Sequence, residues 1–591
     1  MAVTVARADS ARPTTATERA AFADTTVVCV VPSHSGRLIH PGIRGQCPYR
    51  QITPAGYEVL WALTAGASGR GVAGGLDADT YDWRNIQSGS NWGLGGGAFT
   101  TLEFLRYARD SGAWPMITAN LFGGGSKAAD GTFVCQTDHP ERLAADWVRY
   151  TNRILQQYRE GDQAQLAGED LRVLESITGW EGRPRLLSPE EPPVPIVEYW
   201  EIGNEPEVPG IGTMLSNHYL GPEEYRDRYR SMAEAMLAVD CTLRLGPCLT
   251  SPADNPSWLD ALLNAVPPLP IDFVAFHPYY SGIKAAWGDP ALMGDRLRDY
   301  KSFLRRKIRP VRTLLDSRGR ADCELAATEW NPLNWDATSQ QQRSMAMALG
   351  LVEGVFTFAE EGLTAAHFWE QPQSKPCAVA VFSELRDHMG DTLLAGPEAM
   401  GFDPSQIHWR LYATTNRRDR GTLMIWGLNF DDGAPLDVSL CLDGCAYAVR
   451  SGVVRRYGKP GEDGAGGDTA LMLSSGMAWS EEVLAGSLGV CDLRLRLEDA
   501  EITVAILNIV PWPFPDMDRD GDVDVSDFRG FQYCYNGPDR PPAGPECDVA
   551  DYDRDADVDI SDFAVFQACF NGPAQAAACL DTFVSMVRPR P

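Results

Sequence analysis

Short apolar runs alternate with helical patterns between about Val27 and Gly396, and this alternation constrains the fold more than any other feature. Thr101–Ala113 has the apolar spacing of a helix that ends at Gly112, and Trp114–Asn120 follows it as a strand. Apolar strands separated by helices form parallel βα units, and the region is long enough for eight of them. The sequence therefore predicts a (β/α)8 barrel of the TIM type. Further strands are predicted at Ile196–Gly203, Ile271–Phe276, Glu324–Thr328 and Leu363–Trp369, and a second helix at Asp138–Tyr158.

The pattern changes at about Phe402. Thr422–Asn429, Leu436–Leu442 and Ile502–Ile509 are β-rich, and no helical period appears between them, which predicts a β-sandwich that ends in a proline-rich linker. The predicted fold class is thus α/β, a barrel followed by a β-sandwich and a small calcium-binding loop-helix repeat domain. The predicted bounds are 1–25 for a disordered or leader segment, 26–400 for the barrel, 401–510 for the sandwich, 511–575 for the repeat domain and 576–591 for a tail.

The charge of the chain excludes some functions. The formal net charge of −28 argues against nucleic-acid binding, which requires a basic face. No apolar run approaches the roughly 18–20 residues that span a bilayer, so no membrane span is expected. Much of the negative charge is local, because Pro511–Pro573 holds fifteen acidic residues against four arginines, a net of −11. So acidic a segment is either disordered or holds cations.

Fourteen cysteines are many for a cytosolic enzyme. They form no paired CxxC zinc pattern, so we expect disulfides, an oxidising compartment and a secreted, extracellular protein. The first 24 residues lack the clear apolar core of a signal peptide, and Thr26–Pro32 predicts a short strand. Buried thiols remain the alternative for Cys29, Cys323 and Cys377. The cysteines at short spacings are Cys241 and Cys248, Cys441 and Cys445, Cys534 and Cys547, and Cys569 and Cys579.

The acidic segment contains an internal repeat. Its two copies begin at Asp516 and Asp551, an offset of 551 − 516 = 35 residues. Each copy has Asp at loop positions 1, 3, 5, 9 and 12, the oxygen-ligand spacing of an EF-hand-type calcium loop. Because these carboxylates repel one another, we expect Ca²⁺ binding and folding to be coupled. The predicted ligands are Asp516, Asp518, Asp520, Asp527 and the Asp522 carbonyl in the first loop, and Asp551, Asp553, Asp555, Asp562 and the Asp557 carbonyl in the second.

Each copy has an exiting helix alone, because the proline-rich segment before the first loop cannot form an entering one. In the first copy Phe528 and Phe531 share one face of that helix. This duplicated unit, over about Asp516–Pro573, resembles a dockerin domain. The resemblance implies Ca²⁺ as cofactor and a cohesin-type module as partner, through which the chain would attach to a scaffold or surface. A calcium-stabilised cap that binds no partner is the alternative.

Two glutamates follow predicted barrel strands. Glu205 comes after Ile196–Gly203, and Glu329 comes after Glu324–Thr328. Active sites of such barrels lie at the carboxyl ends of the strands. The separation of 329 − 205 = 124 residues leaves room for two or three βα units between the two strands. Paired carboxylates about 5–5.5 Å apart are what a retaining glycosidase needs, one as acid and one as nucleophile.

The motifs around these glutamates resemble clan A of the glycoside hydrolases. YWEIGNEP (Tyr199–Pro206), DFVAFHPYY (Asp272–Tyr280) and ATEWNP (Ala327–Pro332) are similar to its fourth, sixth and seventh strands. GGLDADTYDW (Gly74–Trp83) and WPMITAN (Trp114–Asn120) resemble its second and third. The Asn-Glu and Glu-Trp-Asn pairs are similar to families 51 and 39, which include arabinofuranosidases and β-xylosidases. The resemblance implies hydrolysis of plant or algal cell-wall polysaccharide, with an arabinosyl, xylosyl or β-glucan substrate.

The resemblance also implies roles for individual residues. Glu205 would be the acid/base and Glu329 the nucleophile, with no cofactor for catalysis. Asn204 would donate to the sugar 2-OH. His277 and Tyr279 (or Tyr280) would orient the carboxylates, and a Tyr hydroxyl that donates to Glu329 would keep its pKa low. The remaining candidates for contacts with the sugar are Trp369, Asn120 and Trp330.

Several alternatives remain open from the sequence. Glu201 and Glu207 flank Glu205 as rival acids, but Glu201 is expected deeper in the barrel and Glu207 past its mouth. In RGVAGG, Arg70 lies one residue earlier than the arginine of the family's second-strand motif, so an active-site role for it does not follow. A non-catalytic carbohydrate-binding or scaffold-assembled protein, with calcium-dependent partner capture, is the alternative function.

Overall fold

The computed structural model divides into two compact units. One comprises Leu38–Asp387 and Thr469–Ser475, and the other comprises the remaining segments, including His388–Asp468 and Gly476–Pro591. Neither unit contains, within its described part, a helix long and apolar enough to cross a membrane. The structure describes residues 26–30, 36–47, 63–64, 66–71, 78–79, 82–84, 100–122, 125–127, 133–135, 139–178, 182–208, 219–369, 375–399, 402–404, 407–418, 421–430, 435–442, 447–458, 470–484, 493–511, 515–518, 522–542, 544, 547, 550–552 and 557–573.

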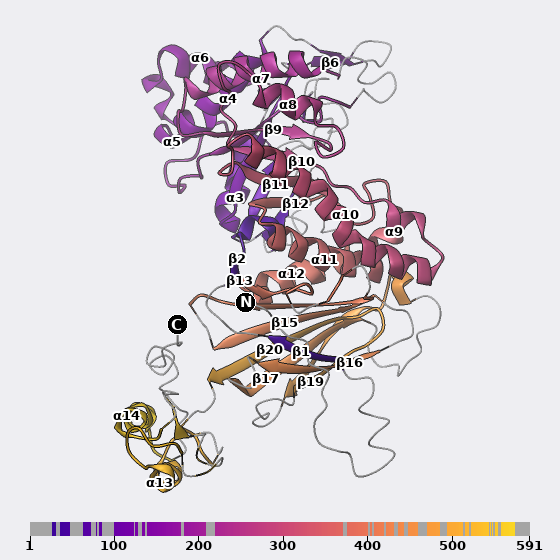
Figure 1. The fold of residues 1–591 in the computed structure, drawn as a ribbon. Coiled ribbons are helices and arrows are strands. Elements are labelled where there is room, and N and C mark those ends of the chain that lie inside the picture. Colours follow the sequence, from indigo (N-terminus) through magenta and orange to yellow (C-terminus); the bar gives the residue numbers. More distant parts are fainter. Residues whose placement is uncertain are drawn as a thin grey trace. The chain divides into compact units, whose positions relative to one another are not determined.

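The first unit is a closed barrel of eight parallel strands, which confirms the predicted (β/α)8 fold (Figure 1). Neighbours in the barrel follow chain order, and the last strand pairs with the first through His367 and Gly45. The fourth, sixth and seventh strands are those predicted from the motifs. In order, the strands are β3 (Gly45–Gln46), β4 (Ser68–Gly71), β5 (Trp114–Ala119), β8 (Tyr199–Ile202), β9 (Arg244–Leu249), β10 (Phe273–Phe276), β11 (Glu324–Trp330) and β12 (Ala365–Phe368).

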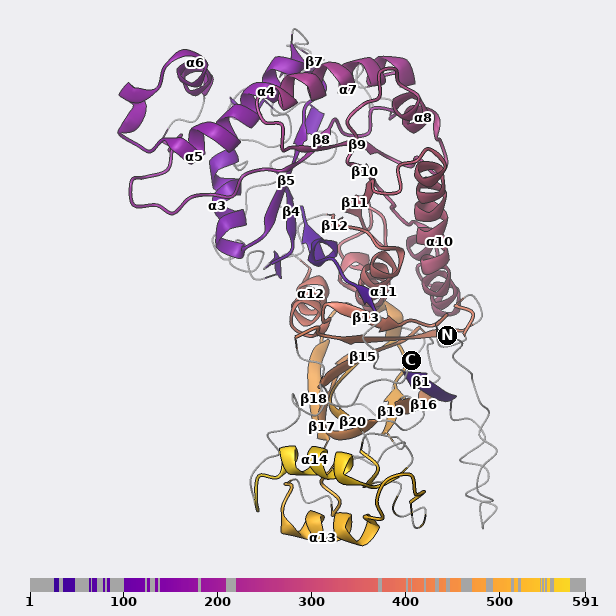
Figure 2. The ribbon, with the colours of Figure 1, turned by 60° about the vertical axis from the view of Figure 1, so that its left-hand side comes forward.

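Helices lie outside the strands of the barrel (Figures 1 and 2). Helix α3 begins at a capping box of Thr100 and Glu103 and ends where Gly112 takes a left-handed φ of 65°. The helices of this unit are η1 (Pro41–Arg44), α3 (Thr101–Ser111), α4 (Pro140–Arg149), η4 (Tyr150–Ile154), α5 (Leu155–Gln157), η5 (Asp162–Gln165), α6 (Gly168–Ser176), α7 (Pro222–Leu237), α8 (Ser257–Leu263), α9 (Gly282–Ala285), α10 (Pro290–Ser317), η7 (Gln341–Arg343), α11 (Met345–Glu361) and α12 (Pro376–His388), and η10 (Ala470–Met472) joins them. A hairpin of β6 (Gly125–Lys127) and β7 (Phe133–Cys135) follows β5.

An apolar layer fills the middle of the barrel, and a polar layer lies nearer its carboxyl end. Side chains alternate along a strand, so every second residue points inward. The apolar cluster of the interior consists of Met116, Cys248, Phe273, Ala275, Ala326 and Ala365, with Trp114 and Tyr199 packed against it. The next inward positions along these strands are polar, namely Thr118, Glu201, His277, Thr328 and His367.

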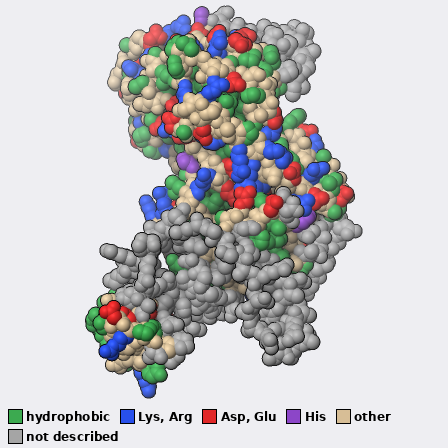
Figure 3. Space-filling model, in the orientation of Figure 1, with side chains coloured by type: hydrophobic (Ala, Val, Ile, Leu, Met, Phe, Trp, Pro, Cys, Tyr) green, Lys and Arg blue, Asp and Glu red, His purple; other side chains and the backbone are tan. Residues whose placement is uncertain are grey.

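The surface of the barrel unit mixes both signs of charge, as Figure 3 shows for one face. Several arginines of α10 are paired with acidic neighbours. Arg305 and Arg309 contact Glu361, and Arg312 contacts Asp316 one turn further along the helix. These pairs neutralise much of the positive charge that α10 carries.

The second unit contains two β-sheets, in agreement with the predicted sandwich. Its core is formed by apolar residues of both sheets, among them Leu440, Leu495, Ile425 and Leu507. The smaller sheet has the order β1 (Thr26–Val30), β16 (Leu436–Leu442), β19 (Leu493–Leu497). The larger has the order β18 (Ala478–Leu484), β17 (Tyr447–Gly458), β20 (Ile502–Pro511), β15 (Thr422–Asn429), β14 (Trp409–Thr415), β13 (Thr392–Ala395), β2 (Arg37–Leu38).

Both predicted ends of the barrel domain differ from the structure. The strand predicted at Thr26–Pro32 forms as β1, but it pairs in parallel with β16 of the sandwich, from Thr26 with Val438 to Val30 with Leu442. At the other end β13 lies before residue 400 and pairs with β14. The barrel therefore starts after residue 37 and not at residue 26. Sequence patterns identify a strand but not its partner, because pairing is a non-local contact.

The acidic repeat forms two equivalent loop-helix units, with helices α13 (Val525–Cys534) and α14 (Ile560–Cys569). Asp524 and Asp559 start these helices with the same capping box, closed by Asp527 and Asp562. The copies exchange hydrogen bonds, since Gly572 N donates to Val523 O and Gly537 N donates to Val558 O. Phe531 is buried between the copies, against Tyr552 and Phe566, so neither half forms this core alone.

The cysteines divide between the predicted classes. Cys534 and Cys547 form a disulfide, as their spacing suggested. Cys241 and Cys248, which also lie at a short spacing, are both free, and Cys248 is buried inside the barrel. Cys323 and Cys377 are free and buried, as the alternative proposed. Cys445 and Cys579 lie outside the described residues.

Candidate active site

Glu205 lies three residues beyond the end of β8, in a strained turn. Its φ of 52° is left-handed, which non-glycine residues rarely adopt and which concentrates at functional sites. Gly203 precedes it with a φ of 84°, and a Cβ there would meet the Leu121 side chain at 2.2 Å, so glycine is required. The Glu205 N–H donates to the Cys248 carbonyl at 3.0 Å, which ties the turn to β9.

Glu329 enters the barrel because β11 contains a bulge. Ala327 pairs with Ala366 and Trp330 with Phe368, so three steps along β11 match two along β12. The extra residue breaks the alternation, and the carboxylate of Glu329 turns toward the interior. A regular strand would have pointed it toward the helices. Its side chain is 4% exposed.

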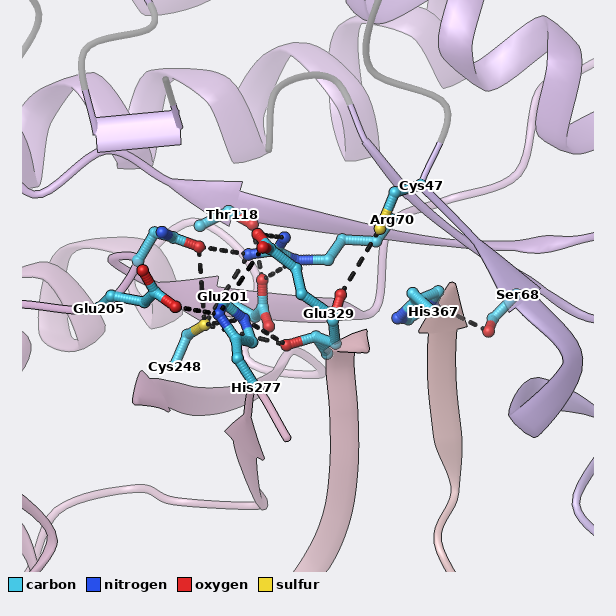
Figure 4. A network of polar contacts seen from close by, with 12 residues as sticks. Cys47, Ser68, Arg70, Thr118, Glu201, Glu205, Cys248, His277, Glu329 and His367 are labelled. Atoms are coloured by element: carbon cyan, nitrogen blue, oxygen red, sulfur yellow. Dashed lines mark hydrogen bonds and ion pairs between the residues drawn. The ribbon is translucent and has the colours of Figure 1, made fainter. Parts of the chain in front are cut away.

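Arg70 of β4 lies at the centre of the polar layer (Figure 4). Its Nε donates to Glu201 Oε2 at 2.6 Å and its Nη1 donates to Glu329 Oε1 at 2.7 Å. The side chains of Arg70 and Glu201 have no exposed surface. Thr118 Oγ1 also donates to Glu201 Oε2, at 2.6 Å. One buried guanidinium therefore bonds two buried carboxylates, and it fixes one oxygen of Glu329.

His277 and Tyr279 reach the two glutamates from the end of β10. His277 Nδ1 lies 2.6 Å from Glu205 Oε1 and 3.8 Å from Glu329 Oε2. The Tyr279 hydroxyl donates to Glu329 Oε2 at 2.8 Å. Burial, and then the charges of Glu329 and Glu205, raise the pKa of Tyr279 well above its ordinary value, so the hydroxyl stays protonated. Tyr280, the alternative candidate, points away, with its hydroxyl near Arg296 O at 3.2 Å.

The charge state of His277 follows from its surroundings. Burial disfavours the charged ring, but Cys248, Glu329 and Glu205 outweigh it and raise the pKa of His277 well above its ordinary range. Burial also raises the pKa of the Cys248 thiol to about 11, so that thiol is neutral near pH 7. The carboxyl groups of Glu329 and Glu205 are therefore the neighbours that favour the proton on His277.

The two candidate carboxylates are close together. An oxygen of Glu205, an oxygen of Glu329 and a ring nitrogen of His277 all lie within 4.8 Å of one another. Glu205 is the more accessible, with 15% of its side chain exposed. Beside them, Asn204 accepts from Arg70 Nη2 at 2.7 Å, and its Nδ2 has no protein partner within the described part of the chain. A buried amide N–H next to two carboxylates can donate to a ligand hydroxyl.

The three remaining candidates lie at the carboxyl ends of β11, β5 and β12. The Trp330 ring is fully buried and packs against Phe358 of α11 and Phe368, where a Cβ on Gly354 would touch it. It belongs to the packing between barrel and helix, as the bulge requires. Asn120 follows β5 and accepts from the Phe122 N–H at 2.6 Å. Trp369 follows β12, is 9% exposed, and its N–H donates to Trp330 O.

Sequence reasoning missed or undervalued five residues of the site. It left Arg70 undecided and treated Glu201 as a rival acid, whereas together they form the ion pair below the glutamates. The second strand is β4, earlier than the predicted Gly74–Trp83, which explains the displaced arginine. Asp79, whose Oδ2 accepts from the Asn204 N–H, and the buried Cys47 and Cys248 carried no sequence signal. A period-two count along β4 and β8 would have shown Arg70 and Glu201 as inward-facing charges.

The repeat domain holds a second cluster of functional interest. Carboxylate oxygens of Asp516, Asp518 and Asp527 lie within 4.8 Å of one another. Asp522 groups with Asp524 and Asp527, and Asp557, Asp559 and Asp562 form the equivalent group in the second copy. Of this second group the sequence predicted Asp562 as a ligand, and Asp557 through its carbonyl. Asp551 is described, whereas Asp520, Asp553 and Asp555 lie outside the described residues.

Comparison with known proteins gives similarity in structure alone. No protein-family model and no curated protein matches the chain. An α-L-arabinofuranosidase from Thermotoga maritima, solved with arabinose, aligns at 15% identity and a TM-score of 0.57 over 81% of this chain and 99% of its own. A family 51 α-L-arabinofuranosidase from Bifidobacterium longum aligns at 16% and 0.56, over 81% and 99%. A family 44 xyloglucanase from Paenibacillus polymyxa aligns at 15% and 0.55, over 82% and 100%. At these identities the shared property is the fold of barrel and sandwich.

Proposed function

We propose that the chain is a retaining glycoside hydrolase, with Glu205 as acid/base and Glu329 as nucleophile. The observation that carries the proposal is the approach of the two carboxylates, whose oxygens lie within 4.8 Å. A retaining enzyme needs about 5–5.5 Å between its carboxyl groups, whereas an inverting enzyme needs roughly 6.5–9.5 Å to admit a water. The short separation therefore favours direct attack by Glu329.

In the first step a Glu329 oxygen attacks the anomeric carbon of the sugar. The bond from that carbon to the leaving oxygen breaks, and the protonated Glu205 gives its proton to that oxygen. Arg70 and Tyr279 each donate to Glu329, which keeps this carboxylate ionised and aimed. Asn204 Nδ2 is the group of this site that can bind a hydroxyl of the same sugar ring.

In the second step water replaces the enzyme on the sugar. Glu205, now ionised, takes a proton from a water that attacks the anomeric carbon, and the bond to Glu329 breaks. His277 Nδ1, 2.6 Å from Glu205 Oε1, donates to the carboxylate form of the acid/base. The same residue therefore supports Glu205 in the state that the second step requires.

We propose a plant or algal cell-wall polysaccharide as substrate, with arabinosyl, xylosyl or β-glucan residues. Its support is the fold shared with an α-L-arabinofuranosidase and a xyloglucanase. We also propose that the protein is secreted. The Cys534–Cys547 disulfide supports that proposal, because such bonds persist in oxidising compartments.

The test is hydrolysis of a panel of aryl glycosides and polysaccharides by the intact protein, by Glu329→Gln and by Glu324→Gln. Glu324 is a matched control, because it lies on the same strand β11 at the opposite end of the barrel. Activity that collapses in Glu329→Gln and persists in Glu324→Gln would support the nucleophile. Early products analysed by NMR should retain the anomeric configuration, and azide should rescue Glu205→Ala but not Glu329→Ala. Inversion, or equal activity in all three proteins, would contradict the assignment.

We propose that the repeat domain binds Ca²⁺ and captures a protein partner of the cohesin type. The donor set fits, because Asp516, Asp518 and Asp527 present clustered hard oxygen ligands, as Ca²⁺ prefers. Burial, and then the charge of Asp518, raise the pKa of Asp527, which supports a cluster that is less favourable without a cation. Bound Ca²⁺ would remove this repulsion and stabilise the loop.

Exposed apolar side chains support partner capture. Val525 and Ile560 occupy the same position in the two copies and are 66% and 63% exposed, and Tyr535 and Phe570 are each 45% exposed. Calorimetric titration with Ca²⁺, and pull-down of a cohesin module with and without chelator, test this proposal. Calcium binding without capture of the cohesin module would favour the alternative, a calcium-stabilised cap that binds no partner. Capture together with an inactive barrel would favour a non-catalytic, scaffold-assembled protein.

A further inference from the structure

The ring of His277 is held at both nitrogens. Nδ1 faces the two glutamates, and Nε2 lies 3.2 Å from Cys248 Sγ and 3.3 Å from Thr328 Oγ1. The ring is completely buried. A charged imidazole carries a proton on each nitrogen, so Nε2–H needs an acceptor inside the barrel. The sulfur and the hydroxyl are the groups of the described residues that supply it.

Cys248 touches more of the site than its sequence suggests. Its sulfur lies 3.8 Å from Arg70 Nη2 and 3.8 Å from Asn204 Oδ1. Its backbone carbonyl accepts the N–H of Glu205. One fully buried residue at the end of β9 therefore anchors the turn of the acid/base and also holds the histidine that contacts this acid/base.

The thiol supplies this contact without a charge. Burial raises the pKa of Cys248 to about 11, so it is a neutral partner of weak polarity in the working pH range. A third carboxylate, at this position, would compete with Glu205 and Glu329 for His277. The charged and titratable groups that surround His277 are Glu205, Glu329, Cys248, Tyr279, Arg70 and His367, from the ends of β8, β11, β9, β10, β4 and β12.

We propose that Cys248 is a positioning residue, whose sulfur holds His277 by Nε2 so that Nδ1 stays on Glu205 through both steps of the reaction. The inference rests on the proposed function and adds a residue to it. Loss of the sulfur removes one of two acceptors for Nε2–H, and it frees the ring to rotate. The protonated state of His277 becomes less favourable, so the His277–Glu205 pair loses its last proton at lower pH.

The first test compares leaving groups. The value of kcat/KM reports the first step of the reaction. A poor leaving group needs the proton from Glu205 in that step, whereas a good leaving group departs without it. Cys248→Ala should lower kcat/KM about tenfold for the poor leaving group and less than about twofold for the good one. The alkaline limb of the pH profile should move to lower pH by roughly half a unit or more. Cys248→Ser should restore most of the loss.

Cys377→Ala is the matched control. Cys377 is also a free, buried thiol of the barrel unit, and it bonds a backbone carbonyl, Gln342 O at 3.4 Å. A purely structural effect would lower kcat/KM equally for both leaving groups, in either variant. Melting temperatures of all variants show whether they fold. If Cys248→Ala matches Cys377→Ala in leaving-group dependence and pH profile, the inference is wrong.

The second test does not need turnover. NMR titration of imidazole-labelled protein, with His277 assigned through His277→Asn, should show a lower titration midpoint of His277 in Cys248→Ala and an unchanged one in Cys377→Ala. If the intact protein hydrolyses no glycoside, the proposed function fails, and this titration still decides whether Cys248 holds His277. An unchanged midpoint would overturn the inference whatever the activity.

Discussion

Removal of the Arg70 guanidinium should damage stability and catalysis together, and the stability loss should be reversible by a second change. Arg70→Met keeps an unbranched apolar stem but leaves Glu201 buried with Thr118 as its remaining donor. It also removes the donor to Glu329 Oε1. The substitution thus removes one cation that donates hydrogen bonds to two carboxylates.

The magnitude follows from the contacts. Arg70 makes two charge-assisted hydrogen bonds of 2.6 and 2.7 Å and a third, of 2.7 Å, to the neutral Asn204. Breaking a fully buried ion pair costs about 3–5 kcal/mol, because the remaining charge has no compensation. We therefore expect the free energy of unfolding of the Arg70→Met variant to fall by about 3–5 kcal/mol. Loss of a donor that fixes the nucleophile should lower kcat by roughly 10²-fold.

The double variant Arg70→Met/Glu201→Gln should recover at least half of the lost stability, because the uncompensated carboxylate is gone. It should recover no activity, because Glu329 still lacks its donor. Chemical denaturation measures the free energy of unfolding, and Arg226→Met, which breaks the exposed Arg226–Asp227 pair, is the control at about 0–1 kcal/mol. A single variant within 1 kcal/mol of wild type, or a double variant less stable than the single, would refute this reasoning.

Three further predictions concern other parts of the chain. Burial raises the pKa of Glu501 to about 7 against the pull of Arg456, so the wild type loses stability as pH rises from about 4.5 to 7. Glu501→Gln should therefore be more stable at pH 8, by up to roughly 3 kcal/mol, and equal near pH 4, in thermal unfolding. Trp330→Ala should lower the free energy of unfolding by about 3–5 kcal/mol and leave KM unchanged, since its ring is core. Loss of the Cys534–Cys547 disulfide should destabilise the repeat by about 3 kcal/mol and weaken Ca²⁺ binding, measured by calorimetry.

For each of these three predictions, one experimental result would contradict it. Glu498, whose side chain is 46% exposed, is the control for Glu501, and an equal response of Glu498→Gln would show that burial is not the cause. A raised KM in a folded Trp330→Ala variant would indicate that Trp330 contacts the substrate. Unchanged Ca²⁺ affinity after removal of both sulfurs would show that the loops are preformed without the disulfide.

Local pattern predicts much of this fold because it depends on neighbours in the chain. The helix at Thr101–Ser111 and the strand at Trp114–Ala119 follow from apolar spacing and from Gly112. The identity of β8, β10 and β11 as the fourth, sixth and seventh strands follows from motif order. The duplicated loop-helix units follow from the repeated Asp spacing. Each of these features repeats or alternates within a window of a few residues.

Tertiary structure decided the features that depend on pairing between distant segments. The partner of β1 is a strand more than 400 residues away, so its membership of the sandwich was not visible. The bulge in β11 turns Glu329 inward and Trp330 outward, which reverses the regular alternation. The roles of Arg70 and Cys248 arise because barrel closure brings β4 and β9 to the same polar layer. The sequence by itself therefore determined which carboxylates stand at strand ends, and the closed barrel decided which arginine, histidine and thiol meet them.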